Sequence, residues 1–200
     1  MIIGITGTIA SGKSTVSDYF IQRGYEVVDA DKITKELQQK EDILEEFREI
    51  FGEEILLENK TLNRTKLREI VFQNTKALEK INQIMHPKVR EEFEKRKREA
   101  AQEKIIFFDI PLLFEAHFEN LCEKILLVCA DKEVQITRIM QRDGSSYELA
   151  KNIIASQEKE EEKKKKSHYI IENNGSMEEL YQKLSKWEEM FNENCRSGGK

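Results

Sequence analysis

Cysteine is scarce in this sequence, and the three present, Cys122, Cys129 and Cys195, are odd in number. No two of them have the C-x-x-C spacing of a zinc site or a redox motif. Two lie in or beside an apolar run, where a thiol packs as a small hydrophobic group. We therefore predict structural thiols in a reducing compartment, without disulfides or zinc.

Long apolar runs are also missing, since no stretch approaches the ~20 residues that a membrane-spanning helix needs. Residues 1–5 are apolar, but Gly4 and Gly7 interrupt the run and no cleavage-site pattern follows, so no secretory signal is predicted. A basic excess is absent too, because the net charge is −5. We expect a cytoplasmic monomer or weak homo-oligomer with no membrane partner and no nucleic-acid partner.

Charged residues make up 36% of the chain and hydrophobic residues 38%. The two signs of charge nearly cancel, and the apolar residues come in periodic blocks, so a folded domain is favoured over disorder. Two hundred residues fit one α/β domain with a small helical insertion. We predict a single domain over residues 1–200.

Short β-branched runs alternate with amphipathic blocks along the chain. Strands are predicted over residues 2–6, 25–28, 105–110, 124–129 and 169–171. Helices are predicted over residues 13–23, 132–142, 147 to about 166, and 177–191. Short buried strands joined by helices imply a parallel sheet with right-handed crossovers, so the predicted fold class is α/β with a five-stranded parallel sheet.

The stretch from about residue 33 to residue 101 has helical periodicity and no strand pattern, which predicts a helical insertion. A turn is expected at residues 58–60, after which Asn63 is placed to cap the next helix. Pro87 suits the first turn of a further helix, because its missing N–H has no partner there anyway.

The segment GTIASGKS at residues 7–14 matches the P-loop pattern G-x-x-x-x-G-K-[ST]. It follows a predicted strand and opens a predicted helix, as the phosphate-binding role requires. Gly7 allows the sharp turn, and Gly12 lets backbone N–H groups approach phosphate oxygens. Lys13 can reach the β- and γ-phosphates, and the Ser14 hydroxyl is placed to ligate Mg²⁺. The predicted ligands are ATP and Mg²⁺.

A carboxylate partner for the metal is expected at the end of a neighbouring strand, and two places compete. Asp109 ends the run IIFFD, which is the Walker-B pattern, while Asp29 and Asp31 end the second strand. An aspartate in such a place also serves as an ordinary helix cap or strand end. For Asp109 both interpretations stay open. For Asp29 and Asp31 a functional role is favoured, since capping the next helix would need only one of the two aspartates.

The run EKEEEKKKK at residues 158–166 suggests a basic binding patch at first sight. Its glutamates and lysines stand four apart in the favourable order, glutamate first, as on the solvated face of a helix. We predict that solvated face, with its positive end directed toward bound phosphate.

Seven motifs in order resemble the dephospho-CoA kinase family over residues 3–175. They are GITGTIASGKST at 4–15, VVDADKI at 27–33, LNRTKLREIVF at 62–72, HPKVR at 86–90, IPLLFE at 110–115, QITRIMQRD at 135–143 and IIENNG at 170–175. The resemblance implies a three-layer α/β/α P-loop fold. It also implies transfer of the ATP γ-phosphoryl group to the ribose 3′-hydroxyl of dephospho-CoA, giving coenzyme A and ADP.

The resemblance also implies roles for individual residues. Asp31 would accept or orient the proton of the acceptor hydroxyl, and Arg138 and Arg142 would close a lid of about residues 138–166 over the phosphates. The nucleotide set is Thr8, Ala10, Ser11, Gly12, Lys13, Ser14, Thr15 and Asn174; the acceptor set is Asp31, Arg64, His86 and Glu115; the metal set is Ser14 and Asp109. Thr8 and Ala10 stand where the family most often has glycine.

Two rival functions use the same loop. A kinase acting on nucleosides or nucleoside monophosphates would share the P-loop and the lid arginines, but it would lack the DAD, HP and PLLFE motifs. A nucleotide-gated switch would typically carry an N/T-K-x-D motif that reads the base, and the sequence has none.

Overall fold

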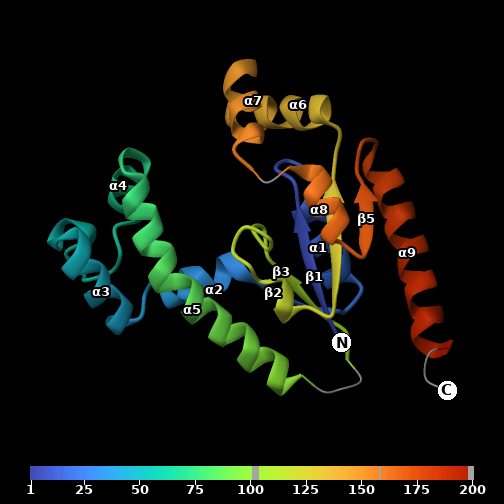
Figure 1. The fold of residues 1–200 in the computed structure, drawn as a ribbon, viewed down its shortest axis with the longest axis horizontal. Helices are drawn as coiled ribbons and strands as arrows, with labels where there is room; N and C mark the ends of the chain where they lie inside the picture. The colour runs from blue at the N-terminus through green and yellow to red at the C-terminus, as the bar shows by residue number, and fades with distance from the viewer. Residues whose placement is uncertain (101–103, 158, 198–200) are drawn as a thin grey trace. The chain divides into compact units, whose positions relative to one another are not determined.

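The computed structural model describes residues 1–100, 104–157 and 159–197. Its elements are β1 (Ile2–Gly7), α1 (Lys13–Gln22), β2 (Glu26–Asp29), α2 (Ala30–Leu37), α3 (Glu41–Phe51), η1 (Glu53–Ile55), α4 (Arg64–Gln73), α5 (Thr75–Glu99), β3 (Ile106–Asp109), η2 (Glu119–Leu121), β4 (Lys124–Cys129), α6 (Lys132–Asp143), α7 (Tyr147–Ala155), α8 (Glu160–Lys166), β5 (Tyr169–Glu172) and α9 (Met177–Ser197) (Figure 1). The chain forms two compact units, residues 1–28 with 102–200 and residues 29–101. Among the described helices, none is long and apolar enough to cross a membrane.

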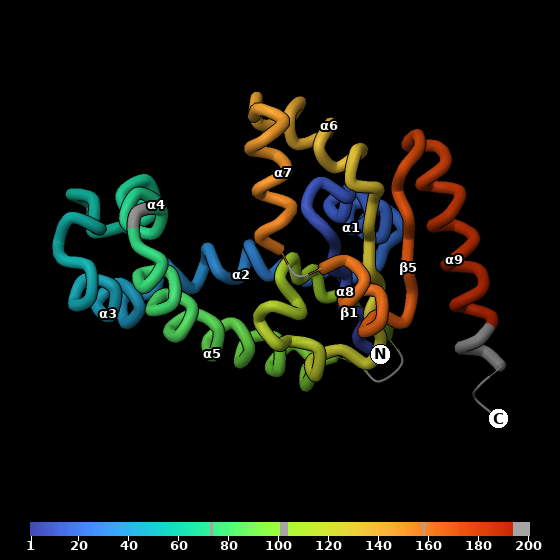
Figure 2. The backbone as a smooth tube through the Cα atoms, turned by 45° about the horizontal axis from the view of Figure 1, so that its top comes forward, coloured from blue at the N-terminus to red at the C-terminus, as the bar shows by residue number. Residues whose placement is uncertain are grey.

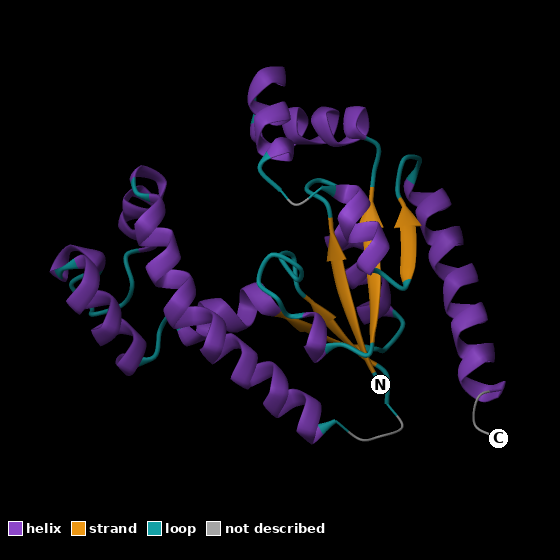
Figure 3. Ribbon diagram, viewed as in Figure 1, coloured by secondary structure: helices purple, strands orange, loops and turns teal. Residues whose placement is uncertain are grey.

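The strands form one sheet in the order β2-β3-β1-β4-β5 (Figure 3). β1 pairs in parallel with β3 and with β4, and β4 pairs in parallel with β5. Because parallel strands need crossovers, each carboxyl end opens into a loop at the same edge of the sheet. The predicted α/β fold with a five-stranded parallel sheet is confirmed.

One face of the sheet packs against α1 and α9. β5 and α9 lie side by side in both views (Figures 1 and 2). Alternate strand residues point into this layer, as the two-residue period of a strand requires. The buried cluster consists of Ile3, Ile5, Val16, Tyr19, Phe20, Phe107, Leu126, Val128, Ile171, Leu180, Leu184, Trp187 and Phe191.

The other face of the sheet is covered by the segment after β3 and by α8, which contacts β4. The approach is close at Gly4, where a Cβ atom would lie 2.7 Å from both the Cys122 Sγ and a Leu113 methyl carbon. Among the described residues Cys122 and Cys129 form no disulfide, and burial raises the pKa of the Cys129 thiol to about 11. Cys129 therefore packs as a small buried group in β4, while the Cys195 side chain lies outside the described residues.

The second unit is helical in its described part, apart from an isolated bridge between Leu56 and Leu62. The side-chain Oδ1 of Asn63 accepts a hydrogen bond from the Lys66 N–H at 3.1 Å, so the predicted cap is confirmed. The prediction for Pro87 is wrong, because this proline lies inside α5. The helix continues through it because an apolar stripe spans the proline and buries one side of α5. The stripe consists of Ala77, Ile81, Met85, Val89 and Phe93.

The prediction of a single helix from residue 147 to about 166 is also wrong, since the structure has two helices there, α7 and α8. The Ser156 hydroxyl donates to the Ile153 carbonyl at 2.7 Å and competes with the helical hydrogen bonds at the end of α7. Lys159 is extended and precedes the first turn of α8. The charged run is not wholly solvated either, because the Lys163 side chain is buried.

Phe20 provides a test of the first layer. Its ring is fully buried and stacks on Phe107 with centroids 4.1 Å apart. We expect Phe20→Ala to lower the free energy of unfolding by about 3–5 kcal/mol in urea denaturation, because a large cavity is left behind. The matched control is Ile21→Ala on the same helix, where the side chain is 53% exposed. A loss no larger than that of the control would contradict the packing described.

Candidate active site

The chain reverses direction in the loop between β1 and α1. Gly12 has φ +89°, a left-handed conformation that favours glycine, and Ala10 also has a positive φ of 57°. The loop is anchored to the sheet by a hydrogen bond from the Thr8 N–H to the Val128 carbonyl at 3.1 Å. A Cβ atom on Gly7 would lie 2.8 Å from the same carbonyl. The glycines predicted to shape the loop thus stand where the chain turns and where the backbone approaches closely.

The side chains of the loop retain unused hydrogen-bonding capacity. The hydroxyl oxygens of Thr8 and Ser11 are buried and have no hydrogen-bond partner among the described residues. Ser14 and Thr15 lie in the first turn of α1, where N–H groups point out of the helix, and Ser14 is exposed. The N–H groups of such a turn can donate hydrogen bonds to an anion, and that anion has to come from a ligand because the chain does not supply one.

Lys13 and Asp109, predicted to serve phosphate and metal, are in direct contact. The Lys13 ammonium group binds Oδ1 of Asp109, and the Ser17 hydroxyl donates to Oδ2 at 2.6 Å. Asp109 is only 6% exposed, so its charge requires these partners. Ser17 was not predicted, although it stands four residues after Lys13 on the same helical face and could have been found by that spacing.

Residues able to hold Mg²⁺ are few here. In the part of the chain that the structure describes, no group of three or more histidine, cysteine or acidic side chains is arranged for a metal. Magnesium in nucleotide sites takes one or two protein ligands and completes its shell with phosphate oxygens and water. Ser14 and Asp109 fit that donor set, with the nucleotide providing the remaining oxygens.

Helices α6 and α7, where the lid is expected, pack on each other around Ile136, Ile139 and Ala150, and Ile9 and Ala10 of the P-loop pack against this cluster. The Arg138 guanidinium donates to the Ala10 carbonyl at 3.2 Å. Arg138 therefore lies at the loop between β1 and α1.

The second lid arginine is engaged elsewhere. Arg142 makes two hydrogen bonds to the Asp143 carboxylate, at 2.7 and 2.8 Å, and its side chain is 59% exposed. These hydrogen bonds raise the pKa of Arg142. The structure brings Arg138 to the loop and leaves Arg142 paired with its sequence neighbour.

Two amide side chains that were not predicted also hold the loop. The Gln157 carbonyl oxygen accepts from the Ile9 N–H at 2.9 Å, and the buried Asn173 amide donates to the Ser11 carbonyl at 2.8 Å. Asn173 also explains Gly12, because a Cβ atom there would collide with the Asn173 amide nitrogen. The available signal for Asn173 was its place directly after β5, at the carboxyl edge of a parallel sheet.

The predicted nucleotide residue Asn174 has a different partner from Asn173. Its side-chain oxygen accepts from the Asp131 N–H at 2.7 Å, so it joins the loop after β5 to the start of α6. The two adjacent asparagines therefore have different roles. Asn173 holds the phosphate loop, and Asn174 connects the loop after β5 to the start of α6.

Glu115, predicted for the acceptor side, lies in the turn segment that follows β3. Its Oε1 lies 2.6 Å from the Lys163 Nζ of α8. Glu115 thus belongs to the unit that holds the P-loop, and its only ion pair among the described residues is with a lysine of the lid segment.

The other predicted acceptor residues belong to the second unit. Asp29 caps α2, because its Oδ1 accepts from the N–H groups of Asp31 and Lys32 at 2.7 and 3.1 Å. Asp31 is exposed and is not used as the cap. Arg64 donates to the Lys35 carbonyl at 3.1 Å, while His86 is half-buried within α5.

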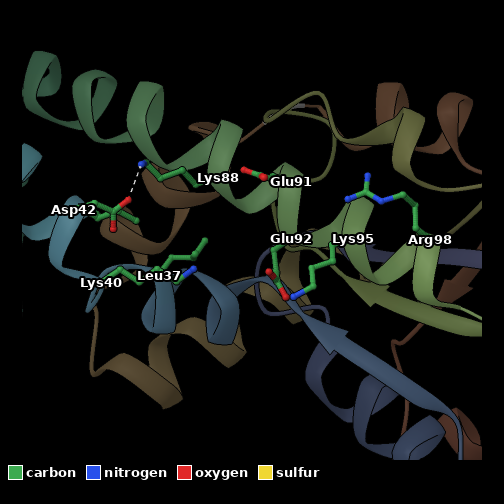
Figure 4. Close-up of a pocket in the computed structure, with 9 residues that line it drawn as sticks. Leu37, Lys40, Asp42, Lys88, Glu91, Glu92, Lys95 and Arg98 are labelled. Carbon is green, nitrogen blue, oxygen red and sulfur yellow. Dashed lines mark hydrogen bonds and ion pairs between the residues drawn. The ribbon is translucent and has the colours of Figure 1, made fainter.

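Both units contain a pocket. A cavity of about 520 Å³ in the first unit opens beside Thr8 and the lid, and it is lined by Thr8, Lys132, Gln135, Ile154, Gln157 and Glu160, among others. The second unit has a cavity of about 310 Å³ among α2, α3 and α5, where Lys88 faces Asp42 (Figure 4). Its Lys88 is already neutralised by Asp42 and Glu46, at 3.4 and 3.1 Å.

Known proteins resemble this chain over nearly its whole length. The sequence model of a family described as dephospho-CoA kinase matches residues 1–179. A dephospho-CoA kinase from Fusobacterium nucleatum is 49% identical, with 94% of this chain and 96% of the relative covered. The solved structure of dephospho-CoA kinase from Campylobacter jejuni superposes with a TM-score of 0.75 at 32% identity, covering 100% of this chain and 98% of that one.

A more distant neighbour agrees on the fold alone. The shikimate kinase from Bacteroides thetaiotaomicron has a TM-score of 0.54 at 15% identity, and covers 96% of this chain and 98% of its own. The fold is thus shared beyond the family. With the family match spanning most of its length, the chain belongs to the dephospho-CoA kinase family, which catalyses the final step of coenzyme A biosynthesis.

Proposed function

We propose that the P-loop and the lid bind Mg·ATP, and that Asp31 serves the acceptor hydroxyl in the transfer of the γ-phosphoryl group to the ribose 3′-hydroxyl of dephospho-CoA. The observation that supports this most is the P-loop itself, whose left-handed Gly12, buried hydroxyls and neighbouring lysine are arranged for an anion. Family membership supports the identity of the acceptor.

The nucleotide phosphates take the place that Asp109 now occupies beside Lys13. The N–H groups at the start of α1 bind phosphate oxygens, because they have no helical partner and lie at the positive end of the helix dipole. Lys13 then neutralises the charge that develops on the β- and γ-phosphates. Mg²⁺, held by Ser14 and Asp109, would supply further neutralisation of the phosphate charge.

The transfer itself needs little covalent chemistry from the protein. The acceptor 3′-oxygen forms a bond to the γ-phosphorus while the bond to the bridging oxygen breaks, and that electron pair leaves with ADP. The hydroxyl proton passes to the Asp31 carboxylate and then to water. Asp31 suits this role because Asp29, and not Asp31, caps α2, which leaves an exposed carboxylate in the first turn.

The lid arginines act on the phosphates from the other side. Arg138 already lies at the phosphate loop through the Ala10 carbonyl. Arg142 exchanges its Asp143 partner for a phosphate oxygen when the nucleotide is bound, since a guanidinium group forms the same paired hydrogen bonds to both. Asn174 and the loop after β5 complete the nucleotide side, while Arg64, His86 and Glu115 contribute to the acceptor side.

The direct test measures ADP formation with dephospho-CoA against a panel of nucleosides and nucleoside monophosphates, with and without Mg²⁺. We expect rapid turnover only with dephospho-CoA, and its loss when the metal is chelated, because the phosphate charge is then left unscreened. Preferred turnover of a nucleoside would instead support the rival kinase. Negligible turnover of every acceptor, together with ATP-dependent binding of a protein, would support a nucleotide-gated switch.

Lys13→Ala tests the phosphate-binding lysine. We expect kcat to fall by about 10²- to 10³-fold, the range found when one preorganised charge donor to a transition state is removed. Stopped-flow or coupled ADP assays provide the measurement. Because the variant also leaves Asp109 without its cation, thermal unfolding is followed in parallel, so that lost turnover is not confused with lost folding. Near-normal kcat in a folded variant would exclude the role.

Asp31→Asn tests the acceptor carboxylate. We expect ATP affinity in calorimetry to stay within about threefold, while kcat falls by about 10²- to 10⁴-fold, as for loss of a general base. The matched control is Asp29→Asn, because asparagine caps a helix as well as aspartate does. That control should retain turnover, and equal losses in the two variants would remove Asp31 from the catalytic role.

A further inference from the structure

Lys163 differs from the other lysines of its run. It lies in α8 among four consecutive lysines, yet its side chain is 0% exposed, whereas Lys165 is 69% exposed. Taking an ammonium group out of water is costly, so lysine is rarely buried unless it is paired. The position therefore calls for a partner, and the structure provides Glu115.

The contact between these residues is an ion pair with capacity left over. Lys163 Nζ lies 2.6 Å from Glu115 Oε1, but neither the ammonium group nor either carboxylate oxygen makes a directed hydrogen bond within the described part of the chain. The Glu115 side chain as a whole is 25% exposed, although both of its carboxylate oxygens are buried. Buried polar atoms without a hydrogen-bond partner indicate a site that a ligand or water completes.

The elements that carry the pair connect it to the reaction. Glu115 lies in the segment that continues from Asp109, the residue in contact with Lys13. Lys163 lies on α8, whose first residue, Glu160, lines the cavity beside Thr8. The Lys166 ammonium group, 5.4 Å from the centre of the Phe114 ring, provides a second contact between α8 and this segment. The lid segment thus contacts two adjacent residues of the loop after β3, Phe114 and Glu115.

Stability alone does not explain the pair. A buried ion pair contributes little net stability, because the cost of removing two charges from water offsets their attraction. Two apolar side chains of similar volume would fill the same space, and they would leave no unused oxygen. The charges are better explained by what they offer to a ligand.

We propose that Lys163 is a positioning residue for the phosphoryl acceptor: its ammonium group fixes the Glu115 carboxylate through Oε1, so that Oε2 receives a hydroxyl group of the acceptor nucleotide. The inference rests on the proposed function, since it names a residue that acts on the acceptor side of the same reaction. Lys163 itself touches neither substrate. It acts through Glu115 and sets the orientation of that carboxylate.

Lys163→Met tests the inference, because methionine keeps an unbranched side chain and removes the charge. We expect the KM for dephospho-CoA to rise by about tenfold, the effect of losing one hydrogen bond to a charged group, while the KM for ATP stays within about twofold. Lys165→Met on the exposed side of α8 is the matched control, with both constants unchanged. A purely structural role would lower stability and change both KM values alike.

Glu115→Gln and the double variant complete the experiment. Glu115→Gln should raise the KM for dephospho-CoA selectively, and adding Lys163→Met to it should cause little further change, because the two residues act as one unit. If Lys163→Met does not fold, Glu115→Gln carries the test alone, since its amide keeps the size of the carboxylate and leaves Lys163 an oxygen. Unchanged acceptor KM in the folded variants, or equal rises for ATP, would overturn the inference.

The wild-type protein separates this inference from the proposed function. Wild-type turnover with dephospho-CoA reports on the proposed function, and only the selectivity of the KM changes reports on Lys163. Turnover in the wild type with no selective change in the variants would leave the function standing and reject the positioning role.

Discussion

The site depends on one constraint, which is that the chain reverses between β1 and α1 while the first N–H groups of α1 keep no helical partner. That requirement puts Gly12 in a left-handed conformation and brings the loop close to the Val128 carbonyl. Three side chains from outside the loop then hold it. Arg138 and Asn173 bind its carbonyl groups and Gln157 binds its Ile9 N–H, so that carbonyl dipoles are occupied while donors at the start of α1 remain.

This arrangement joins α6, α7 and the loop after β5 to the loop between β1 and α1. The small apolar cluster of α6 and α7 takes in Ile9 and Ala10, so the lid is attached to the loop by packing as well as by hydrogen bonds. A loop ordered in advance loses less conformational entropy when the phosphates bind. The positive φ of Ala10 is tolerated because these contacts determine the backbone there.

Sequence reasoning worked where the signal is local. The strands and the P-loop follow from short-range periodicity and from a spacing pattern, and Asn63 follows from its place before an amphipathic helix. It failed where a distant segment decides the outcome. Pro87 stays inside α5 because apolar residues on both sides of it share one buried stripe, which outweighs the lost hydrogen bond. Lys163 is buried because Glu115, far away in the chain, neutralises it, and no helical pattern within the charged run could reveal this.

The contact between Lys13 and Asp109 also bears on which anions the site accepts. With its own carboxylate beside it, the lysine presents little net positive charge to solvent, so free inorganic anions gain little from approaching it. An anion that captured Lys13 alone would strand a buried aspartate that is only 6% exposed. A ligand that arrives with its own cation satisfies both members of the pair at once. The charge balance of this pair therefore favours a ligand that brings both an anion and a cation over a simple anion.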